Sequence, residues 1–497
     1  MSDIDRAPTL IIGAGPVGLV LALALSHQGI RSTIVERDPD AVRESRALNF
    51  WPRTLETFRN LGFLGDLMER GTFVTRLEPL DPRSGRPLLR LDFTGLEELS
   101  PVSGTLMCPQ NTAEEVLRER VAGDPLITEV AGECVRIEQD ASGVSAEVER
   151  DGRRLLLTAD YLVGTDGARS TVRRCAGVPM EGETSDDRML LSDELISPSP
   201  EGWLRFALDE PGFLVGIRFG PEQWRIMGST PPEGADEEAA ARHRVRALFG
   251  DVSSTTTWAS TFNVHRRVAG RYRVGRVLLA GDAAHLISPI GGQGLNAGIN
   301  EAENLAWKLA EAFAGGDADL LLDSYEEECR GLMTSSISQQ IDAGTRAEMS
   351  TPRWAKKLMV KGLSVAMSFP RMNLSMARSL SMLNSAYPSS GSLMVGDHGL
   401  VGSRLSDPRI SGERRLSDSL AGRAAFVLCG RGPDLPSAAG LPVVRVPDPP
   451  GQWGLRGESV LVVRPDRHVG AIAPADMGAE DLNTLSRIVL GHQRAAA

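Results

Sequence analysis

A glycine-rich stretch at 281–300, GDAAHLISPIGGQGLNAGIN, has the residue types of a ligand-binding loop. An apolar run before it predicts a buried strand, and apolar side chains at helical spacing in 300–313 predict a helix after it. Gly291, Gly292 and Gly294 permit the backbone to approach a flat ligand closely. The start of that helix would present free N–H groups and a partial positive charge, which favour a ligand that becomes anionic there.

A second glycine motif lies near the N-terminus. Residues 9–37 predict a strand, a turn, a helix and a second strand, and Glu36 closes the second strand. An acid at this point accepts hydrogen bonds from ribose hydroxyls and repels a 2′-phosphate, so FAD or NAD is favoured over NADP. A purely structural glycine turn is the alternative. The turn has GxGxxG spacing and consists of Gly13, Gly15, Pro16, Val17 and Gly18, with Ala14 between the first two glycines.

The remaining patterns predict the elements that position these two motifs. In chain order they predict a helix at 45–70, a loop-rich stretch at 75–110, a helix capped by Asn111 or Thr112, hairpin strands at 133–165, a second sheet at 186–275 and helices at 303–345. The second sheet therefore interrupts a nucleotide-binding fold that resumes at the first glycine stretch.

Residues 350–384 are rich in methionine, a side chain that adapts to irregular surfaces. We interpret them either as an adaptable core or interface helix or as one wall of a roomy apolar substrate pocket. The methionines in and next to this segment are Met349, Met359, Met367, Met372, Met376 and Met382. After a linker at 387–399, four short apolar runs predict a separate C-terminal α/β domain.

Composition excludes several classes of protein. The chain has 497 residues, enough for two or three domains, and its net charge of −11 argues against nucleic acid as a partner. No run approaches the roughly 20 apolar residues of a membrane span, and the N-terminus does not have the pattern of a signal peptide. The five cysteines are scattered, without CxxC or metal-ligand spacing. We therefore expect a reduced, cytoplasmic protein without a metal, a membrane partner or a disulfide framework.

Three blocks together resemble the single-component FAD-dependent aromatic hydroxylases, the family of p-hydroxybenzoate and phenol hydroxylases. The blocks are IIGAGPVG with Glu36, YLVGTDGARSTVR, and GDAAHLISPIGGQGLNAGINEAENLAWKL. The sequence is most similar to the actinomycete enzymes that hydroxylate aromatic polyketides. The resemblance implies an α/β fold: a glutathione-reductase-type FAD-binding Rossmann domain, an interrupting mixed β-sheet substrate domain and a thioredoxin-like C-terminal domain.

The resemblance also implies domain boundaries. They are a FAD-binding domain at 1–185 with a substrate-side insertion at about 72–108, a substrate domain at 186–275, the resumed FAD-binding domain with helices at 276–395, and the thioredoxin-like domain at 396–497. Thioredoxin chemistry needs CxxC, and this last segment has only Cys429, so we expect a structural or dimerising role.

Individual FAD contacts follow from the resemblance, and for Asp166 a capped turn with an ion pair is the alternative. The GxGxxG turn would surround the pyrophosphate, Glu36 would hold the adenosine ribose, Asp166 would order the pyrophosphate loop, and Asp282 would bind the ribityl hydroxyls. Pro289 would lie beside the reactive edge of the flavin. The further expected contacts are Arg37, Arg46, Gln110, Cys134, Gly292, Gly294, Leu295 and Asn296.

The sequence also departs from the family pattern at positions outside these contacts. Phe50 and Trp51 stand where relatives usually have a histidine before the arginine, and we expect them to alter the rim of the flavin site. Glu301 stands where aspartate is usual.

The activity implied is an NAD(P)H- and O2-dependent monooxygenase that hydroxylates an aromatic, polycyclic phenolic substrate through a flavin C4a-hydroperoxide. NADPH or NADH is the transient reductant, and the protein is a monomer or homodimer. No catalytic side chain is assigned. Candidates on the substrate side are Trp224, Arg225, His265 and Pro289, and His285 is expected to brace the loop.

Two alternatives stay open. One is a Baeyer–Villiger or epoxidising monooxygenase on the same scaffold, and the other is a non-catalytic FAD-binding protein. A flavin-dependent halogenase is disfavoured because the motif WxWxIP is absent.

Overall fold

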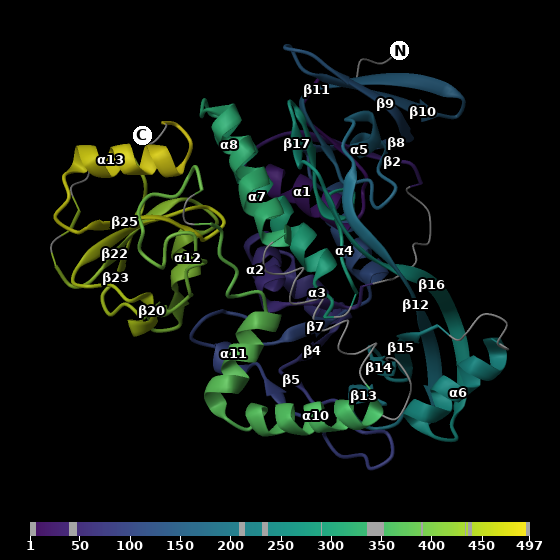
Figure 1. The fold of residues 1–497 in the computed structure, drawn as a ribbon. Coiled ribbons are helices and arrows are strands. Elements are labelled where there is room, and N and C mark those ends of the chain that lie inside the picture. The colour runs from purple at the N-terminus through teal and green to yellow at the C-terminus, as the bar shows by residue number, and fades with distance from the viewer. Residues whose placement is uncertain are drawn as a thin grey trace.

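Three sheets organise the chain, as the computed structural model shows in Figure 1. Arg46 and Met349 lie outside the residues that the structure describes. Those residues are 6–38, 47–207, 214–230, 237–289, 291–334, 352–388, 391–432, 434–435 and 440–493.

The eight-stranded sheet has a parallel core in the order β18-β11-β1-β2-β8. Helices cover this core because parallel strands are joined by crossovers, which is why its strands are apolar on both faces. The expected strand–turn–helix–strand unit at 9–37 and the hairpin strands at 133–165 are confirmed. The strands are β1 (Ala7–Ile12), β2 (Ser32–Glu36), β8 (Ile127–Ala131), β9 (Glu133–Gln139), β10 (Val144–Arg150), β11 (Arg153–Gly164), β17 (Arg273–Val274) and β18 (Val277–Leu279).

Helices α1 (Pro16–His27) and α7 (Gly294–Phe313) pack against each other beside this sheet. Gly298 allows their close approach, because a Cβ there would lie 2.8 Å from the Val17 side chain and 3.0 Å from the Gly281 Cα. The helix predicted to follow the glycine stretch therefore begins within the stretch itself, at Gly294.

The helix predicted over 45–70 is two helices, α2 (Pro52–Asn60) and α3 (Leu64–Arg70). The expected cap of the following helix by Asn111 or Thr112 is wrong. Helix α4 (Gln110–Ala122) starts earlier, directly after the extended Pro109, so both residues already lie inside the helix. Short strands surround these helices: β3 (Asn49–Phe50), β4 (Thr72–Val74), β5 (Arg76–Leu77), β6 (Leu91–Asp92) and β7 (Thr105–Met107).

The six-stranded sheet has the order β13-β14-β15-β12-β16-β19. The expectation of a mixed sheet is wrong for the described residues, where every pairing between these named strands is antiparallel. Short links such as the one joining β14 to β15 permit only antiparallel pairing, since a parallel pair needs a long crossover. The elements are β12 (Met180–Ser197), β13 (Leu204–Phe206), β14 (Leu214–Arg218), β15 (Gln223–Ser229), α6 (Glu237–Phe249), β16 (Ser253–Ala269) and β19 (His285–Leu286).

Helix α6 was not predicted by the strand-like interpretation of 186–275. It covers one face of the six-stranded sheet, where Leu248 and Phe249 pack against Trp224 and Ile226. Other short helical elements are η1 (Thr94–Leu96), α5 (Thr171–Cys175), η2 (Gly281–Ala283) and the π-helical turn η3 (Glu326–Arg330). Other longer helices are α8 (Ala318–Tyr325), α10 (Arg353–Met367) and α11 (Pro370–Leu380).

The four strands expected near the C-terminus are confirmed and form one sheet in the order β23-β22-β24-β25. Strand β23 is parallel to β22, whereas β24 and β25 are antiparallel to their neighbours. Apolar clusters fill both faces of this sheet. Its elements are β20 (Arg409–Ser411), β21 (Arg414–Arg415), α12 (Leu416–Leu420), β22 (Ala425–Cys429), β23 (Val443–Val446), η5 (Gly451–Trp453), β24 (Ser459–Val463), β25 (Val469–Pro474) and α13 (Ala479–Val489).

Buried charges join the C-terminal sheet to α2. The Glu56 carboxylate of α2 binds both Arg404 and Arg467, and all three side chains are buried. Burial alone would raise the pKa of Glu56, but the two guanidinium groups lower it to about 2. An unpaired charge here would be costly, so the two parts of the chain are held in one arrangement.

A second group of buried charges joins the same sheet to α7 and η3. Glu328 binds Lys308 and Arg464, with Nζ and Nη1 at 2.7 and 2.6 Å from its oxygens. Arg464 also binds Asp466 at 2.6 Å, and Asp466 accepts a hydrogen bond from the indole of Trp307. We call this group and the Glu56 group together the buried ionic junction.

Among the described residues, no helix combines the length and the apolar character needed to traverse a bilayer.

Candidate functional site

The N-terminal glycine turn is as tight as its spacing predicts. Gly13 has a φ of +107°, and a Cβ there would lie 2.6 Å from the Thr165 carbonyl oxygen. A Cβ at Gly18 would lie 2.0 Å from the carbonyl oxygen of Gly13. Gly15 precedes α1, and Pro16 and Val17 begin the helix. The turn therefore brings bare backbone to the N-terminus of a helix, which suits a pyrophosphate.

Glu36 reaches this turn from the end of β2. Its Oε2 accepts a hydrogen bond from the backbone N–H of Ala14 over 2.8 Å. The neighbouring Arg37 is exposed, with its guanidinium 3.5 Å from the Glu133 carboxylate. Glu36 thus brings a carboxylate to the glycine turn, and Arg37 lies at the surface beside it.

The sequence analysis missed Arg118, whose guanidinium donates a hydrogen bond to the Ala14 carbonyl over 3.1 Å. Its signal was present in the sequence, because Gln110, Glu114 and Arg118 follow each other at four-residue spacing on one face of α4. Gln110 also accepts a hydrogen bond from the Ala47 backbone N–H over 3.3 Å. This face of α4 therefore borders both the glycine turn and the start of the segment that leads to α2.

Cys134 and Asp166 differ in what they offer to a ligand. Cys134 is a buried residue of β9, and burial raises the pKa of its thiol to about 12. The Oδ2 of Asp166 accepts hydrogen bonds from the backbone N–H groups of Thr171 and Val172 at 2.6 and 3.1 Å. Its Oδ1 is buried and makes no hydrogen bond within the described part of the chain. Asp166 thus accepts hydrogen bonds from the first turn of α5, whose N-cap is Ser170, and keeps its other oxygen available to a bound group.

The second glycine motif is held by Asn296 in the first turn of α7. The Asn296 side chain accepts from the Trp51 backbone N–H over 2.9 Å and donates to the carbonyls of Asn49 and Gly292 at 3.1 and 2.7 Å. A Cβ at Gly292 would lie 2.1 Å from the Asn49 Oδ1. Helix α7 begins at Gly294 with no side-chain cap, so its first N–H groups are not covered by a capping side chain.

Glu301, which stands where the family pattern has aspartate, supports the end of the strand before this loop. Its Oε2 accepts from the Gly281 backbone N–H over 2.9 Å and lies 3.2 Å from the Nε2 of His285. Burial lowers the pKa of His285, but Glu301 and Asp282 together outweigh it and the net pKa is raised. His285 therefore braces the loop, as the sequence predicted. Asp282 is exposed next to Gly281, while Pro289 and Leu295 are half-buried.

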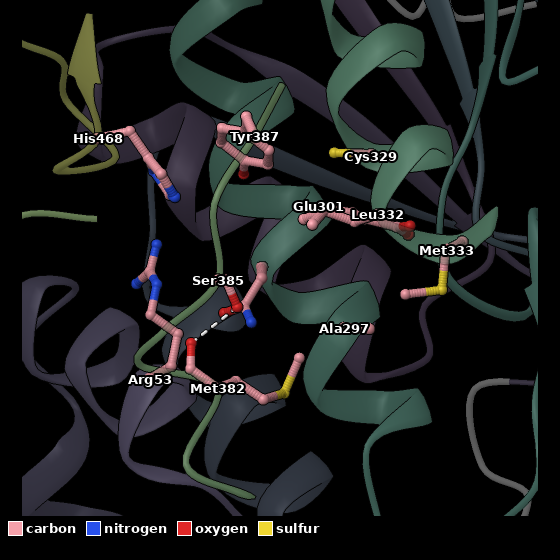
Figure 2. Close-up of a pocket in the computed structure, with 11 residues that line it drawn as sticks. Arg53, Ala297, Glu301, Cys329, Leu332, Met333, Met382, Ser385, Tyr387 and His468 are labelled. Atoms are coloured by element: carbon pink, nitrogen blue, oxygen red, sulfur yellow. Dashed lines mark hydrogen bonds between the residues drawn. The ribbon is translucent and has the colours of Figure 1, made fainter. Parts of the chain in front are cut away.

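A small cavity lies behind the first two turns of α7 (Figure 2). Its volume is ≈ 30 Å³, room for about one water and too little for an aromatic ring. Ala297 and Glu301 line it from α7, and Tyr387 and His468 from later in the chain. Figure 2 shows the Arg53 guanidinium pointing toward His468 across this space. The cavity is thus part of the packing between α7 and the C-terminal sheet.

The adjacent residues Trp224 and Arg225 point to opposite faces of β15, as strand geometry requires. Trp224 is fully buried on the α6 side, with its ring 4.8 Å from that of Phe249 and its indole donating to Ser199. Arg225 binds Asp193 through two hydrogen bonds of 2.7 and 2.8 Å, and also donates to the Ala47 carbonyl over 3.4 Å. Arg225 is thus the one of the pair that contacts the segment leading to α2.

The Arg225 face of the six-stranded sheet carries an apolar cluster that the sequence analysis missed. Its signal was the two-residue alternation along the strands. The cluster consists of Met189, Leu204, Phe206, Val215, Ile217, Met227, Phe262 and Val264, several of them only partly buried. His265 follows the cluster and is half-buried, with Nδ1 3.0 Å from the Thr184 hydroxyl. Burial lowers the pKa of His265.

Comparisons with known proteins identify the family of the chain. The family model described as FAD binding domain matches residues 6–339. YhjG of Bacillus subtilis, described as an uncharacterised aromatic compound monooxygenase, is 32% identical over 480 residues, 93% of each chain. The 12-dehydrotetracycline 5-monooxygenase/anhydrotetracycline 6-monooxygenase of Streptomyces rimosus is 31% identical, covering 98% of this chain and 99% of its own.

Solved structures extend the likeness to the whole chain. The OxyS anhydrotetracycline hydroxylase from Streptomyces rimosus has a TM-score of 0.79 at 30% identity, covering 99% of this chain and 100% of its own. The flavin-dependent monooxygenase PieE, solved with FAD and substrate, has a TM-score of 0.79 at 25% identity over the same shares. The chain therefore belongs to the FAD binding domain family and is a FAD-dependent monooxygenase.

Proposed function

We propose that this enzyme hydroxylates a polycyclic phenolic substrate, with NADPH or NADH as reductant and O2 as co-substrate. The observation that carries the proposal is the convergence of the two glycine motifs and Asp282. Val17 of the first motif lies 2.9 Å from where a Cβ of Gly281 would be, and Gly298 of α7 packs against both. One extended ligand of the size of FAD is the group that would use all of these places.

The residues present fit FAD. The Gly13 and Gly18 positions have no room for a side chain, and one buried oxygen of Asp166 makes no hydrogen bond to the residues that the structure describes. We propose that Glu36 accepts hydrogen bonds from the adenosine ribose, that Asp282 does so from the ribityl chain, and that the turn holds the pyrophosphate. Gln110 and Arg118 border the same space from α4.

The bound FAD supplies the electron-transfer and oxygen chemistry. The chain's own part is to stabilise charge and exclude water. The N–H groups of Gly294, Leu295 and Asn296 at the start of α7 favour negative charge on a ring placed against them. Pro289 and Gly292, which carry no flexible side chain, would border the ring.

For the substrate side, we infer that the apolar cluster of the six-stranded sheet forms the wall facing FAD. Arg225 and Asp193 at its edge supply a polar anchor close to Ala47. A polycyclic substrate is supported by the tetracycline monooxygenases among the relatives and the solved structures. No protein side chain is assigned as acid or base.

The domain division is part of the proposal. Residues 1–185 and 276–395 would hold FAD, 186–275 would form the substrate side, and 396–497 would be a thioredoxin-like unit. The strand order β23-β22-β24-β25, with one parallel and two antiparallel pairings, is consistent with that unit. Its Cys429 is buried, and burial raises the pKa of the thiol to about 12, so we propose a structural role for it.

Turnover under labelled dioxygen tests the function. The FAD-loaded enzyme is expected to be bleached by NADPH or NADH without air and to transfer one labelled oxygen atom to a polycyclic phenol, read by mass spectrometry. A lactone product would support the Baeyer–Villiger alternative instead of hydroxylation, and an epoxide product would support the epoxidising alternative. Flavin that neither reductant bleaches would favour a non-catalytic FAD-binding protein.

A further inference from the structure

Helices α10 and α11 carry a row of large apolar side chains on their outer surface. We call this row the outer stripe, and Figure 1 shows the two helices following one another along one edge of the molecule. On α10, Trp354, Leu358 and Val365 share one helix face because of their spacing. The stripe consists of Trp354, Leu358, Val365, Phe369, Met372 and Met376, which are between 36% and 72% exposed.

The opposite side of these helices is attached to the protein. Met367 and Ala377 are buried, and the Asn373 side chain binds the backbone of Asp92 and Arg90 at 3.0 and 2.8 Å. The stripe is therefore the outward face of two anchored helices. Monomeric proteins rarely expose so many large apolar side chains in one row, and such a row marks an interaction surface. Of the two sequence interpretations of this methionine-rich segment, the exposed Met359, Met372 and Met376 favour the interface helix.

The charge of this segment is opposite to that of the whole chain. Residues 349–396 contain six basic residues and no acidic one, whereas the chain has a net charge of −11. Lys357 and Lys361 are exposed and lie along one edge of the stripe. A second copy docked through the same face would bring like charges together, which disfavours self-association. The partner must therefore be apolar within and anionic at its surface.

We propose that the outer stripe binds reversibly to an anionic phospholipid surface. A helix with Trp, Phe and Leu on one face and lysines at its edge is the pattern of interfacial membrane binding. The stripe is carried on two outward-facing helices, which suits a bilayer surface better than the groove that a protein partner would have to provide. This attachment is peripheral and needs no membrane-spanning segment. It does not depend on the proposed substrate.

Flotation of the full-length FAD-loaded protein with lipid vesicles tests the proposal. The protein is expected to float with vesicles of phosphatidylcholine and phosphatidylglycerol, to stay behind with phosphatidylcholine alone, and to be released by salt. The double variant Lys357→Glu with Lys361→Glu is expected to weaken binding roughly thirtyfold or more. Trp354→Ser with Phe369→Ser is expected to weaken it by more than about tenfold.

Leu156→Ser is the matched control, because Leu156 is 66% exposed but lies on β11 in the eight-stranded sheet. It is expected to float like the unaltered protein. FAD content and melting temperature establish that each variant is folded. Equal binding to both vesicle types, or binding to neither, would overturn the proposal. A dimer of the unaltered protein that Trp354→Ser with Phe369→Ser converts to monomer would assign the stripe to a second copy instead.

Discussion

Trp51 fixes the glycine loop through its indole, whose N–H donates a hydrogen bond of 3.0 Å to the carbonyl of Gly291. The Trp51 backbone N–H also binds the Asn296 side chain, which in turn binds Gly292. One residue at the start of α2 therefore sets the position of the loop before α7. Trp51 is one of the two residues that we expected to alter the rim of the flavin site, and in this structure it holds the loop through the carbonyl of Gly291.

Replacing Trp51 by Phe keeps an aromatic ring against Phe93 and removes the hydrogen bond to Gly291. One hydrogen bond contributes about 0.5–1.5 kcal/mol net. If loop order limits FAD binding, Trp51→Phe raises the FAD dissociation constant by roughly twofold to tenfold. Fluorescence titration of the apoprotein with FAD measures this change.

Trp453→Phe is the control for that substitution. Trp453 is also buried and its indole donates a 2.7 Å hydrogen bond to the Ser406 hydroxyl, within the C-terminal part of the chain. It is expected to lower the melting temperature without changing FAD affinity. Equal FAD affinities for Trp51→Phe and the unaltered protein would show that the Gly291 contact does not order the site.

Gly18→Ala is expected to abolish tight FAD binding. The added methyl would lie 2.0 Å from the Gly13 carbonyl oxygen, so the turn must open or shift. Gly65→Ala provides the control, because Gly65 is in α3 and its added methyl meets no atom within 4 Å. The purified Gly18→Ala protein should be colourless while Gly65→Ala stays yellow. A yellow Gly18→Ala protein with normal affinity would remove this turn from the FAD site.

Sequence patterns predicted the elements that depend on local spacing. These elements are the glycine turns, the parallel strands and the apolar helix faces. Their signals, such as residue periods of two and 3.6, can be read directly from the sequence. Patterning could not reveal Glu56 with Arg404 and Arg467, because the partners are more than 300 positions apart along the chain. It also missed α6, whose apolar face is defined only by the sheet that it covers.

The misses at the site have the same origin. Glu301 was noted only as a replacement for the usual aspartate, yet one of its oxygens reaches both Gly281 and His285. The antiparallel pairing of the six-stranded sheet depends on the direction in which each strand runs beside its neighbour, and periodicity does not encode that direction. Trp224 and Arg225 were considered together, although neighbouring strand residues face opposite sides and only Arg225 contacts Ala47.

The His285–Glu301 pair predicts a pH dependence with a definite sign. The folded-state pKa of His285 is raised above 6.5, although burial alone would lower it, because Glu301 and Asp282 favour the charged ring. The stabilisation is therefore fully present below pH 6.5 and is lost as the pH rises through the folded pKa. Glu301→Gln keeps an acceptor for Gly281 but removes the charge, so burial should then bring the pKa of His285 below 6.5.

NMR titration of the histidine rings measures both values. His265 is the internal control, since burial and Arg267 lower its pKa and it belongs to the six-stranded sheet. Its titration should be the same in the Glu301→Gln variant and in the unaltered protein. An unchanged His285 pKa in the variant would mean that another group holds the charged ring.

Acid is expected to weaken the buried ionic junction. Burial opposes the ionised form of Glu56, yet Arg404 and Arg467 lower its pKa from 4.5 to about 2. A lowered pKa stabilises the fold above pH 4.5, and this contribution, about 3 kcal/mol, is lost as the pH falls toward about 2. Glu56→Gln leaves two buried guanidinium groups without their counter-charge, which costs about 3–5 kcal/mol near pH 7.

Melting temperatures measured from about pH 7 down to about pH 3 test this account. The unaltered protein should lose stability steeply below pH 4.5, whereas Glu56→Gln should start lower and fall less. Glu413→Gln is the control, because Glu413 pairs with Arg409 at the surface and such pairs contribute little. Parallel acid curves for the unaltered protein and Glu56→Gln would show that the acid sensitivity lies elsewhere. Glu328 of the junction would then be the next carboxylate to test. Burial opposes its ionised form, but Arg464 and Lys308 outweigh burial and lower its pKa to about 2 as well.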